Sequence, residues 1–175
     1  MLYIRHAEKS YKNGDSSEFP LDPDLTHNGR EQAKIKFQEL FNNYGCPSRI
    51  ISSPYLRARE TAKIAQDVIL EATGKRVKIS YDSSIGEYLG HQNNISLEQG
   101  LRPETLGLNP IPHETLSQYR SRVRQHNRTR RQFGNSWYIS HGIVIQSIAH
   151  FNDTKTPYPA PLGAIHIDNG DITVI

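Results

Sequence analysis

Residues 2–10 read LYIRHAEKS, and this stretch decides the fold. Its first half, Leu2 to Ile4, is a short apolar run of the kind that forms a buried β-strand. The run ends abruptly in Arg5 and His6. In open α/β sheets, ligands bind beyond the carboxyl ends of the strands. A charged pair directly after a buried strand therefore predicts such a sheet, with a functional group at the strand end.

The rest of the chain alternates between helical and extended patterns. We expect a helix from about His27, capped by Thr26 and ended by Gly45, because Ser and Thr favour N-caps and Gly favours C-caps. A second helix should be capped by Ser53 and end at Gly74. Further helices are predicted over residues 114–131, with a core face of Leu116, Tyr119 and Val123, and over residues 143–151.

Additional strands are expected at residues 50–51, 77–81 and 137–139. Asn169-Gly170 lies between two further apolar runs and is a strong signal for a hairpin. Residues 82–113 show no period and should form an ordered excursion over the sheet. Together these patterns predict an α/β fold, a three-layer α/β/α sandwich with a mostly parallel central sheet and one antiparallel edge strand.

Composition narrows the class of protein. The 175 residues suit a single domain over residues 1–175, with 35% hydrophobic and 22% charged residues. No apolar run approaches the length of a membrane span, and no signal peptide is evident. Cys46 is the only cysteine, which excludes an internal disulfide and a thiolate zinc cage, and makes the cytoplasm the expected compartment. The net charge of +3 suits an anionic ligand without indicating nucleic acid.

Five side chains fall at the carboxyl ends of the predicted strands. Arg5 and His6 follow the first strand, Arg57 lies in the first turn of the helix after the second, Glu87 follows the third and His141 follows the fourth. Arginine matches phosphate oxygens with a planar fork of donors, and a neutral imidazole is a nucleophile at pH 7. A carboxylic acid can protonate a leaving oxygen. The set therefore predicts phosphoryl transfer from a phosphorylated, anionic substrate.

Four motifs resemble a known family. RHAEK at 5–9, LTHNGREQA at 25–33, SSPYLRARETA at 52–62 and SHG at 140–142 resemble the histidine phosphatase superfamily, branch 1, which includes the cofactor-dependent phosphoglycerate mutases. The resemblance covers nearly the whole chain in the family's order, and it implies a phosphoglycerate mutase-like fold.

The resemblance also implies roles for the five residues. His6 would be the nucleophile that forms a phosphohistidine, and Glu87 would be the general acid. Arg5, Arg57 and His141 would surround the transferred phosphoryl group. No metal or organic cofactor is implied, and the remaining histidines show no ligand-like pairing on one helical face.

Some further positions differ from the family's motifs, and others match them outside the five site residues. Ala7 replaces the usual glycine after the nucleophile, and Glu114 matches the acidic residue that opens a later helix. Lys12, with Asn13 beside it, stands where the mutases carry a substrate-contacting asparagine, so both are candidate substrate-binding residues. Gly142 matches the small residue after the second histidine and is a third candidate. It replaces the aspartate of the acid phosphatase branch.

These features favour a phosphatase acting on a phosphomonoester of a small molecule or a phosphoprotein. A phosphoglycerate mutase-type phosphotransferase is the alternative within the family. An alternative of another class is a silent scaffold that binds nucleic acid or protein through an arginine stripe, formed by Arg120, Arg124, Arg128 and Arg131. Because no nucleic-acid module accompanies the stripe, the sequence favours a solvated helical face.

Overall fold

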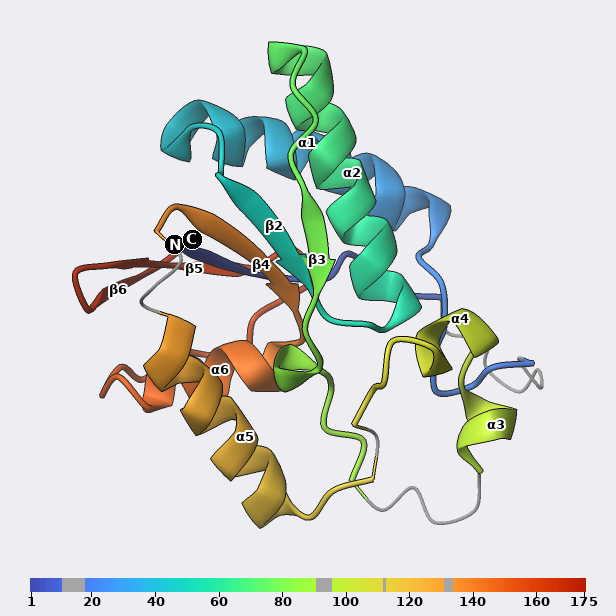
Figure 1. Cartoon of the computed structure of the whole chain (residues 1–175). Coiled ribbons are helices and arrows are strands. Elements are labelled where there is room, and N and C mark those ends of the chain that lie inside the picture. The colour runs from blue at the N-terminus through green and yellow to red at the C-terminus, as the bar shows by residue number, and fades with distance from the viewer. Residues whose placement is uncertain (11–17, 91–95, 112, 131–133) are drawn as a thin grey trace.

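The chain folds around a mixed sheet of six strands (Figure 1). The computed structural model describes residues 1–10, 18–90, 96–111, 113–130 and 134–175, with only the backbone described for residues 97 and 98. The strand order is β3-β2-β4-β1-β5-β6. The strands are β1 (Leu2–Arg5), β2 (Arg49–Ser52), β3 (Ile79–Tyr81), β4 (Ser136–Ser140), β5 (Ala164–Asp168) and β6 (Asp171–Val174).

The first four strands pair in parallel, and antiparallel pairing is confined to one side of the sheet. β1 pairs in parallel with β4, β4 with β2, and β2 with β3. β5 pairs antiparallel with both β1 and β6. The predicted mostly parallel sheet with an antiparallel edge is confirmed. The order places β1 inside the sheet, so the chain beyond Arg5 leaves from its middle.

Helices cover both faces of the sheet, as the three-layer prediction requires (Figure 1). α1 (His27–Tyr44) and α2 (Leu56–Thr73) cover one face, while α5 (Leu116–Thr129) and α6 (Gly142–His150) cover the other. Alternation along β1 supplies both cores, because successive side chains of a strand point to opposite faces. Ile4 packs in the cluster that holds Phe37 of α1, and Tyr3 packs in the cluster that holds Val144 of α6.

The predicted helix ends are partly confirmed. The Thr26 side chain accepts a hydrogen bond from the backbone of Gly29, and Gly45 and Gly74 follow the ends of α1 and α2. The prediction for Ser53 is wrong, since α2 begins at Leu56.

The first turn of α2 is completed by a distant residue. The Leu56 N–H donates to the Asp22 carboxylate at 2.7 Å, so a loop side chain satisfies a donor that a local cap would otherwise take. In α5, Thr115 forms a capping box with Gln118. Leu116 was expected in the core but is 43% exposed, whereas Tyr119 and Val123 are buried.

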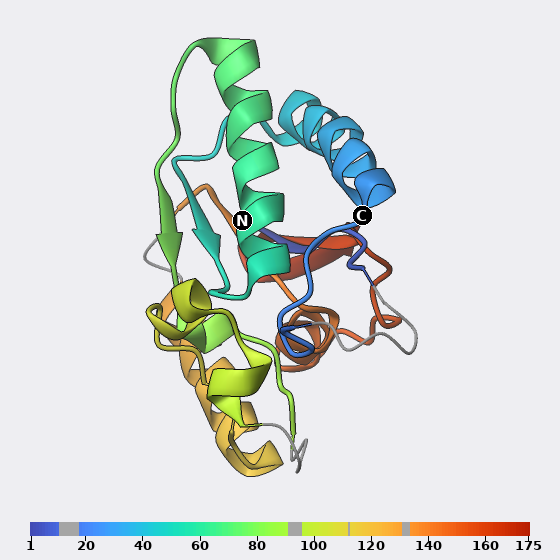
Figure 2. The same cartoon turned by 90° about the vertical axis from the view of Figure 1, so that its right-hand side faces the viewer.

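The excursion over residues 82–113 is ordered where the structure describes it. It contains a 3₁₀ turn, η1 (Ser83–Ile85), and two short helices, α3 (Leu97–Gly100) and α4 (Pro103–Leu106). Figure 2 shows the short helices beyond the carboxyl ends of β2 and β3. Within the described residues, no helix is both long and apolar enough to cross a membrane.

Candidate active site

His6 lies directly after β1 and is 2% exposed. Its backbone N–H donates to the Ser140 carbonyl at 2.9 Å, which fixes it beside the end of β4. Its ring Nδ1 lies 2.7 Å from the Ala7 carbonyl, so Nδ1 carries the proton and donates it. That tautomer leaves the lone pair on Nε2, the nitrogen available for nucleophilic attack.

Arg57, Glu87 and His141 meet at one carboxylate oxygen. Arg57 Nη2 donates to Glu87 Oε2 at 2.9 Å, and His141 Nδ1 lies 2.9 Å from the same oxygen. The His6 and His141 ring centroids are 5.2 Å apart. Four predicted site residues therefore lie together. His6 follows β1, His141 follows β4, Arg57 lies in the first turn of α2, and Glu87 follows η1.

Ser53 and Tyr55 hold His141 in place. The Ser53 hydroxyl lies 2.8 Å from His141 Nε2, and the Tyr55 ring meets the imidazole edge-on at 5.4 Å between centroids. With the Ser53 hydroxyl donating to Nε2, the proton of the neutral imidazole sits on Nδ1, facing Glu87. His141 is fully buried, so this tautomer is set by protein contacts rather than by water.

Burial determines the charge of both imidazoles. It lowers the pKa of His141 from 6.5 to about 4, with Arg57 acting in the same direction and Glu87 opposing. Burial, then the positive charge of Arg57, also holds the pKa of His6 well below its ordinary value. Both rings are therefore neutral at pH 7, which leaves His6 nucleophilic.

Glu87 is ionised in this arrangement. Burial alone would raise its pKa, but His141 and the Arg57 guanidinium outweigh that effect and hold the pKa of Glu87 well below 4.5. Its side chain is only 17% exposed. The pKa of Glu87 would rise if a further negative charge bound nearby, or if another anion took over the hydrogen bond from Arg57.

Arg5 is held at the edge of the site by the segment before β5. Its Nη1 donates to the Pro159 carbonyl at 2.7 Å, and its guanidinium lies 5.0 Å from the centroid of the Tyr158 ring. The Tyr158 ring packs closely against Gly142. A Cβ added to Gly142 would lie only 2.4 Å from Tyr158 Cζ. Only glycine fits this contact without moving the ring.

The segment that carries Glu87 is anchored to α5. Arg122 donates to the carbonyls of Ser84 at 2.8 Å and Gly86 at 3.3 Å. The Arg122 guanidinium is paired with Glu114, which is 5% exposed. Glu114 is the residue that the motif comparison singled out. It does not reach the site itself, but it orients Arg122, which in turn holds the segment that carries Glu87.

The site contains buried donors suited to an anion. Arg5 Nε and Arg57 Nε are buried, and no described residue accepts a hydrogen bond from either of them. His141 Nδ1 is also buried and faces Glu87 Oε2, 2.9 Å away. Buried donors in native proteins nearly always have an acceptor. A tetrahedral oxyanion offers several acceptor oxygens and negative charge beside two arginines, so the donor set fits a phosphoryl group.

A cation fits the same place less well. His6, Glu87 and His141 do place potential ligand atoms within 4.8 Å of one another. However, a cation there would have to compete with the Arg57 guanidinium for the same Glu87 oxygen, 2.9 Å away. Like-charge repulsion from a buried arginine opposes cation binding.

Three predicted substrate-binding residues and one residue that the sequence did not single out remain to be placed. Lys12 and Asn13 lie outside the described residues, and Gly142 is buried at the start of α6. The sequence did not single out Asp22, which is fully buried and accepts from Leu56 N–H and the Thr105 hydroxyl. The only local signal was an aspartate in a Pro-rich loop, which is typical of ordinary turns.

Comparison with protein families identifies the chain. The family model described as "Histidine phosphatase superfamily (branch 1)" matches residues 1–175. The chain belongs to this superfamily. No curated protein sequence matches it.

Solved structures of similar fold come from histidine phosphatases and related proteins. An ecdysone phosphate phosphatase from Bombix mori, solved with tungstate, is 18% identical with a TM-score of 0.65, and the match covers 99% of this chain and 90% of that one. A putative phosphohistidine phosphatase, SixA, from Agrobacterium tumefaciens is 13% identical with a TM-score of 0.64, covering 99% and 93%. A putative α-ribazole-5′-P phosphatase from Escherichia coli is 17% identical with a TM-score of 0.66, covering 99% and 93%. At these identities the similarity establishes the histidine phosphatase fold.

Proposed function

We propose that this protein is a phosphatase that hydrolyses a phosphomonoester through a phosphohistidine on His6, with residues 1–175 as one catalytic domain. One observation carries the proposal. His6 presents a neutral imidazole with a free Nε2 in a buried cluster that also contains Arg57 and His141. Membership of the superfamily supports the same chemistry.

In the first step, the substrate phosphoryl group lies among the donors of Arg5, Arg57 and His141. His6 Nε2 attacks phosphorus in line, a P–N bond forms and the P–O bond to the leaving alcohol breaks. Charge is spread over the phosphoryl oxygens in the transition state, so fixed donors stabilise it.

Glu87 supplies the proton for the leaving oxygen. In the empty site its pKa is held low because His141 and Arg57 outweigh the effect of burial. A bound phosphoryl group takes up donors of both residues and adds negative charge, and each effect raises the pKa of a carboxyl group. Glu87 therefore takes up one proton from solvent as the substrate binds, and it donates that proton to the leaving oxygen.

The second step returns the enzyme to its starting state. Glu87, now a carboxylate, accepts a proton from water while the water oxygen attacks phosphorus. The P–N bond breaks, inorganic phosphate leaves and His6 is neutral again. Glu87 releases the proton to solvent once the phosphate has gone and its pKa falls back. The same residue acts as acid and then as base, as microscopic reversibility requires of a two-step displacement.

The alternative is a mutase, which returns the phosphoryl group to a second hydroxyl of the substrate. Water and a sugar-acid hydroxyl are equivalent nucleophiles for the second step, so the five residues suit both reactions. The similar structures include proteins named as an ecdysone phosphate phosphatase, a putative α-ribazole-5′-P phosphatase and a putative phosphohistidine phosphatase. Because all three names describe phosphatases, a phosphatase is the better proposal for this chain.

The test is a screen of phosphate esters, phosphopeptides and phosphoglycerate against wild-type protein and His6→Ala. The proposal predicts release of inorganic phosphate by wild type and none by the variant. Full activity in His6→Ala would refute the mechanism. Conversion of one phosphoglycerate isomer into another, without phosphate release, would favour the mutase.

A further inference from the structure

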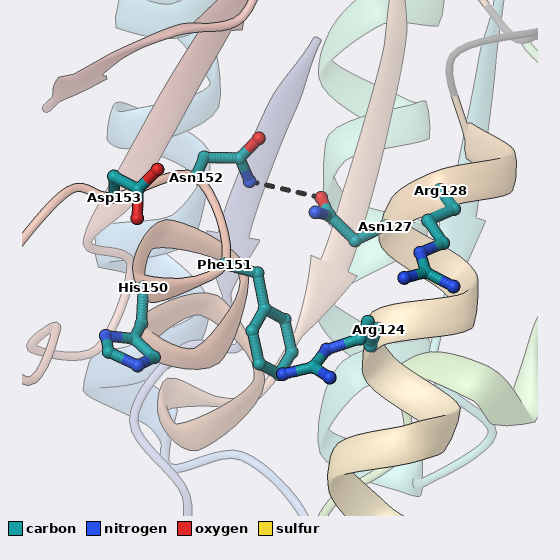
Figure 3. A pocket seen from close by; sticks show the side chains of 7 residues that line it. All are labelled: Arg124, Asn127, Arg128, His150, Phe151, Asn152 and Asp153. Atoms are coloured by element: carbon teal, nitrogen blue, oxygen red, sulfur yellow. Dashed lines mark hydrogen bonds between the residues drawn. The ribbon is translucent and has the colours of Figure 1, made fainter.

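A basic groove runs between α5 and the end of α6, away from the phosphate site. It consists of two adjoining hollows of about 580 and 440 Å³ that share His150 and Phe151. Figure 3 shows Arg124 and Arg128 of α5 on one wall of the larger hollow, and Phe151 and Asn152 on the other. Arg120 and Lys155 line the smaller one. Three of the four arginines predicted to form a stripe therefore line this groove, and Arg131 lies outside the described residues.

The groove is strongly one-sided in charge. Arg120, Arg124, Arg128 and Lys155 are exposed, and none forms an ion pair with any described residue. Asp153 is the only carboxylate among the described residues that line the two hollows. An uncompensated row of positive charge favours an anionic ligand.

One of these cations, Arg124, is held in place by a contact with α6's end. The Arg124 guanidinium lies 4.9 Å from the centroid of the Phe151 ring, a cation–π contact that leaves its outer N–H groups available. Behind it, the Asn152 side chain donates to Asn127 at 3.2 Å and to the Ile148 carbonyl at 2.7 Å, which ties the end of α6 to α5 (Figure 3). Arg124 therefore loses less conformational freedom on binding a ligand than a mobile side chain would.

The spacing of the row indicates the shape of the ligand. Arg120, Arg124 and Arg128 follow one another at four-residue intervals on α5, and a helix rises about 1.5 Å per residue, so each step is about 6 Å. Alternate residues of an extended peptide are about 6.6 Å apart and point to the same side. Carboxylates on alternate residues of an extended segment would therefore meet successive arginines.

A single nucleic-acid strand fits the groove less well. Such strands bind basic grooves whose aromatic rings are open for base stacking. Here Phe151 already stacks with the Arg124 guanidinium. The modest net charge of +3 also gives little general attraction for nucleic acid.

We propose that this groove is a docking site for an extended, acidic peptide segment of a partner protein. The groove is connected to the phosphate site through α6, which begins at Gly142 beside His141 and ends at His150 in the groove, about 12 Å along the axis. A corollary, which rests on the proposed function, is that an acidic segment of a phosphoprotein would dock there while its phosphate reaches His6.

Binding can be measured without any catalysis. Fluorescence anisotropy would compare a labelled alternating Glu-Ser peptide, an alternating Gln-Ser peptide and an oligothymidylate on wild type and on Arg124→Gln/Arg128→Gln. Lys75→Gln/Lys78→Gln removes the same charge from another exposed surface and is the matched control. We expect the acidic peptide alone to bind, about tenfold more weakly to the groove variant and unchanged in the control. If Arg124→Gln/Arg128→Gln fails to fold, Arg120→Gln replaces it.

Three outcomes would overturn the proposal: no binding of the acidic peptide, equal binding to the groove variant and wild type, or preferential binding of oligothymidylate. The kinetic arm compares a phosphopeptide with and without an alternating Glu extension, using p-nitrophenyl phosphate as the small substrate. The extension should lower KM in wild type only, with p-nitrophenyl phosphate turnover unchanged in the groove variant. If the protein hydrolyses no ester at all, the proposed function is wrong. The anisotropy measurement still shows whether the groove binds an acidic peptide.

Discussion

The buried, neutral state of His141 makes a quantitative prediction for stability. Burial lowers the pKa of this imidazole from 6.5 to about 4. Between those values the unfolded chain binds a proton at this position and the folded chain does not. Stability rises with pH wherever the unfolded state binds more protons, so acidification through this window destabilises the fold.

The size of the effect follows from the two pKa values. The loss accumulates at about 1.4 kcal/mol per pH unit below 6.5 and levels off near pH 4, so it amounts to about 2 kcal/mol between about pH 7.5 and about pH 5. Glu87 contributes in the same direction, but only below 4.5, because its folded pKa lies under that ordinary value. The chosen interval therefore leaves out Glu87. Because His6 and the N-terminal amine also have lowered pKa values, a variant that removes His141 alone is needed to separate its contribution.

The assay is urea unfolding of wild type and His141→Gln at both ends of this interval. The glutamine keeps a polar group near Ser53 and does not titrate, so the variant should lose about 2 kcal/mol less than wild type on acidification. His27→Gln, which removes an exposed histidine, is the control. Identical pH dependence of unfolding in wild type and His141→Gln would refute the reasoning.

Three further predictions concern catalysis. Glu87→Gln should slow the hydrolysis of alkyl phosphates by about a hundredfold or more. It should slow the hydrolysis of p-nitrophenyl phosphate much less, because nitrophenolate leaves without a proton. Equal losses for the two substrates would contradict the general-acid role. Gly142→Ala should displace Tyr158 and raise KM, and adding Tyr158→Ala should relieve the clash; a variant as active as wild type would show that the contact is unimportant. Chelators should leave turnover of freshly purified protein unchanged; loss of activity restored by a divalent ion would indicate a metal at His6, Glu87 and His141.

Local patterns in the sequence predicted most of the architecture. Thr26, Gly45 and Gly74 mark helix ends because these three caps bond to backbone groups only three or four residues away. The Asn169-Gly170 turn joins β5 to β6 with both residues at positive φ, as its type demands. The expected convergence of His6 and His141 rested on parallel strands ending at one edge, and β1 and β4 do pair in parallel.

Features that depend on contacts between distant segments escaped prediction. Ser53 looks like a helix cap, yet its hydroxyl bonds to His141, 88 residues away. Asp22 completes the first turn of α2 from a loop with no periodic pattern. Leu116 follows the apolar period of α5 but is exposed, because the period defines a helix face and does not say how far along the helix that face is covered.

The central claim is that His6 accepts the phosphoryl group. The most direct measurement mixes the protein with a hydrolysed ester, quenches in alkali to preserve phosphohistidine, and maps the modified peptide by mass spectrometry. The account predicts the added mass of one phosphoryl group on the peptide that contains His6, and none in His6→Ala. A phosphoryl group on another residue, or turnover by His6→Ala at the wild-type rate, would contradict it.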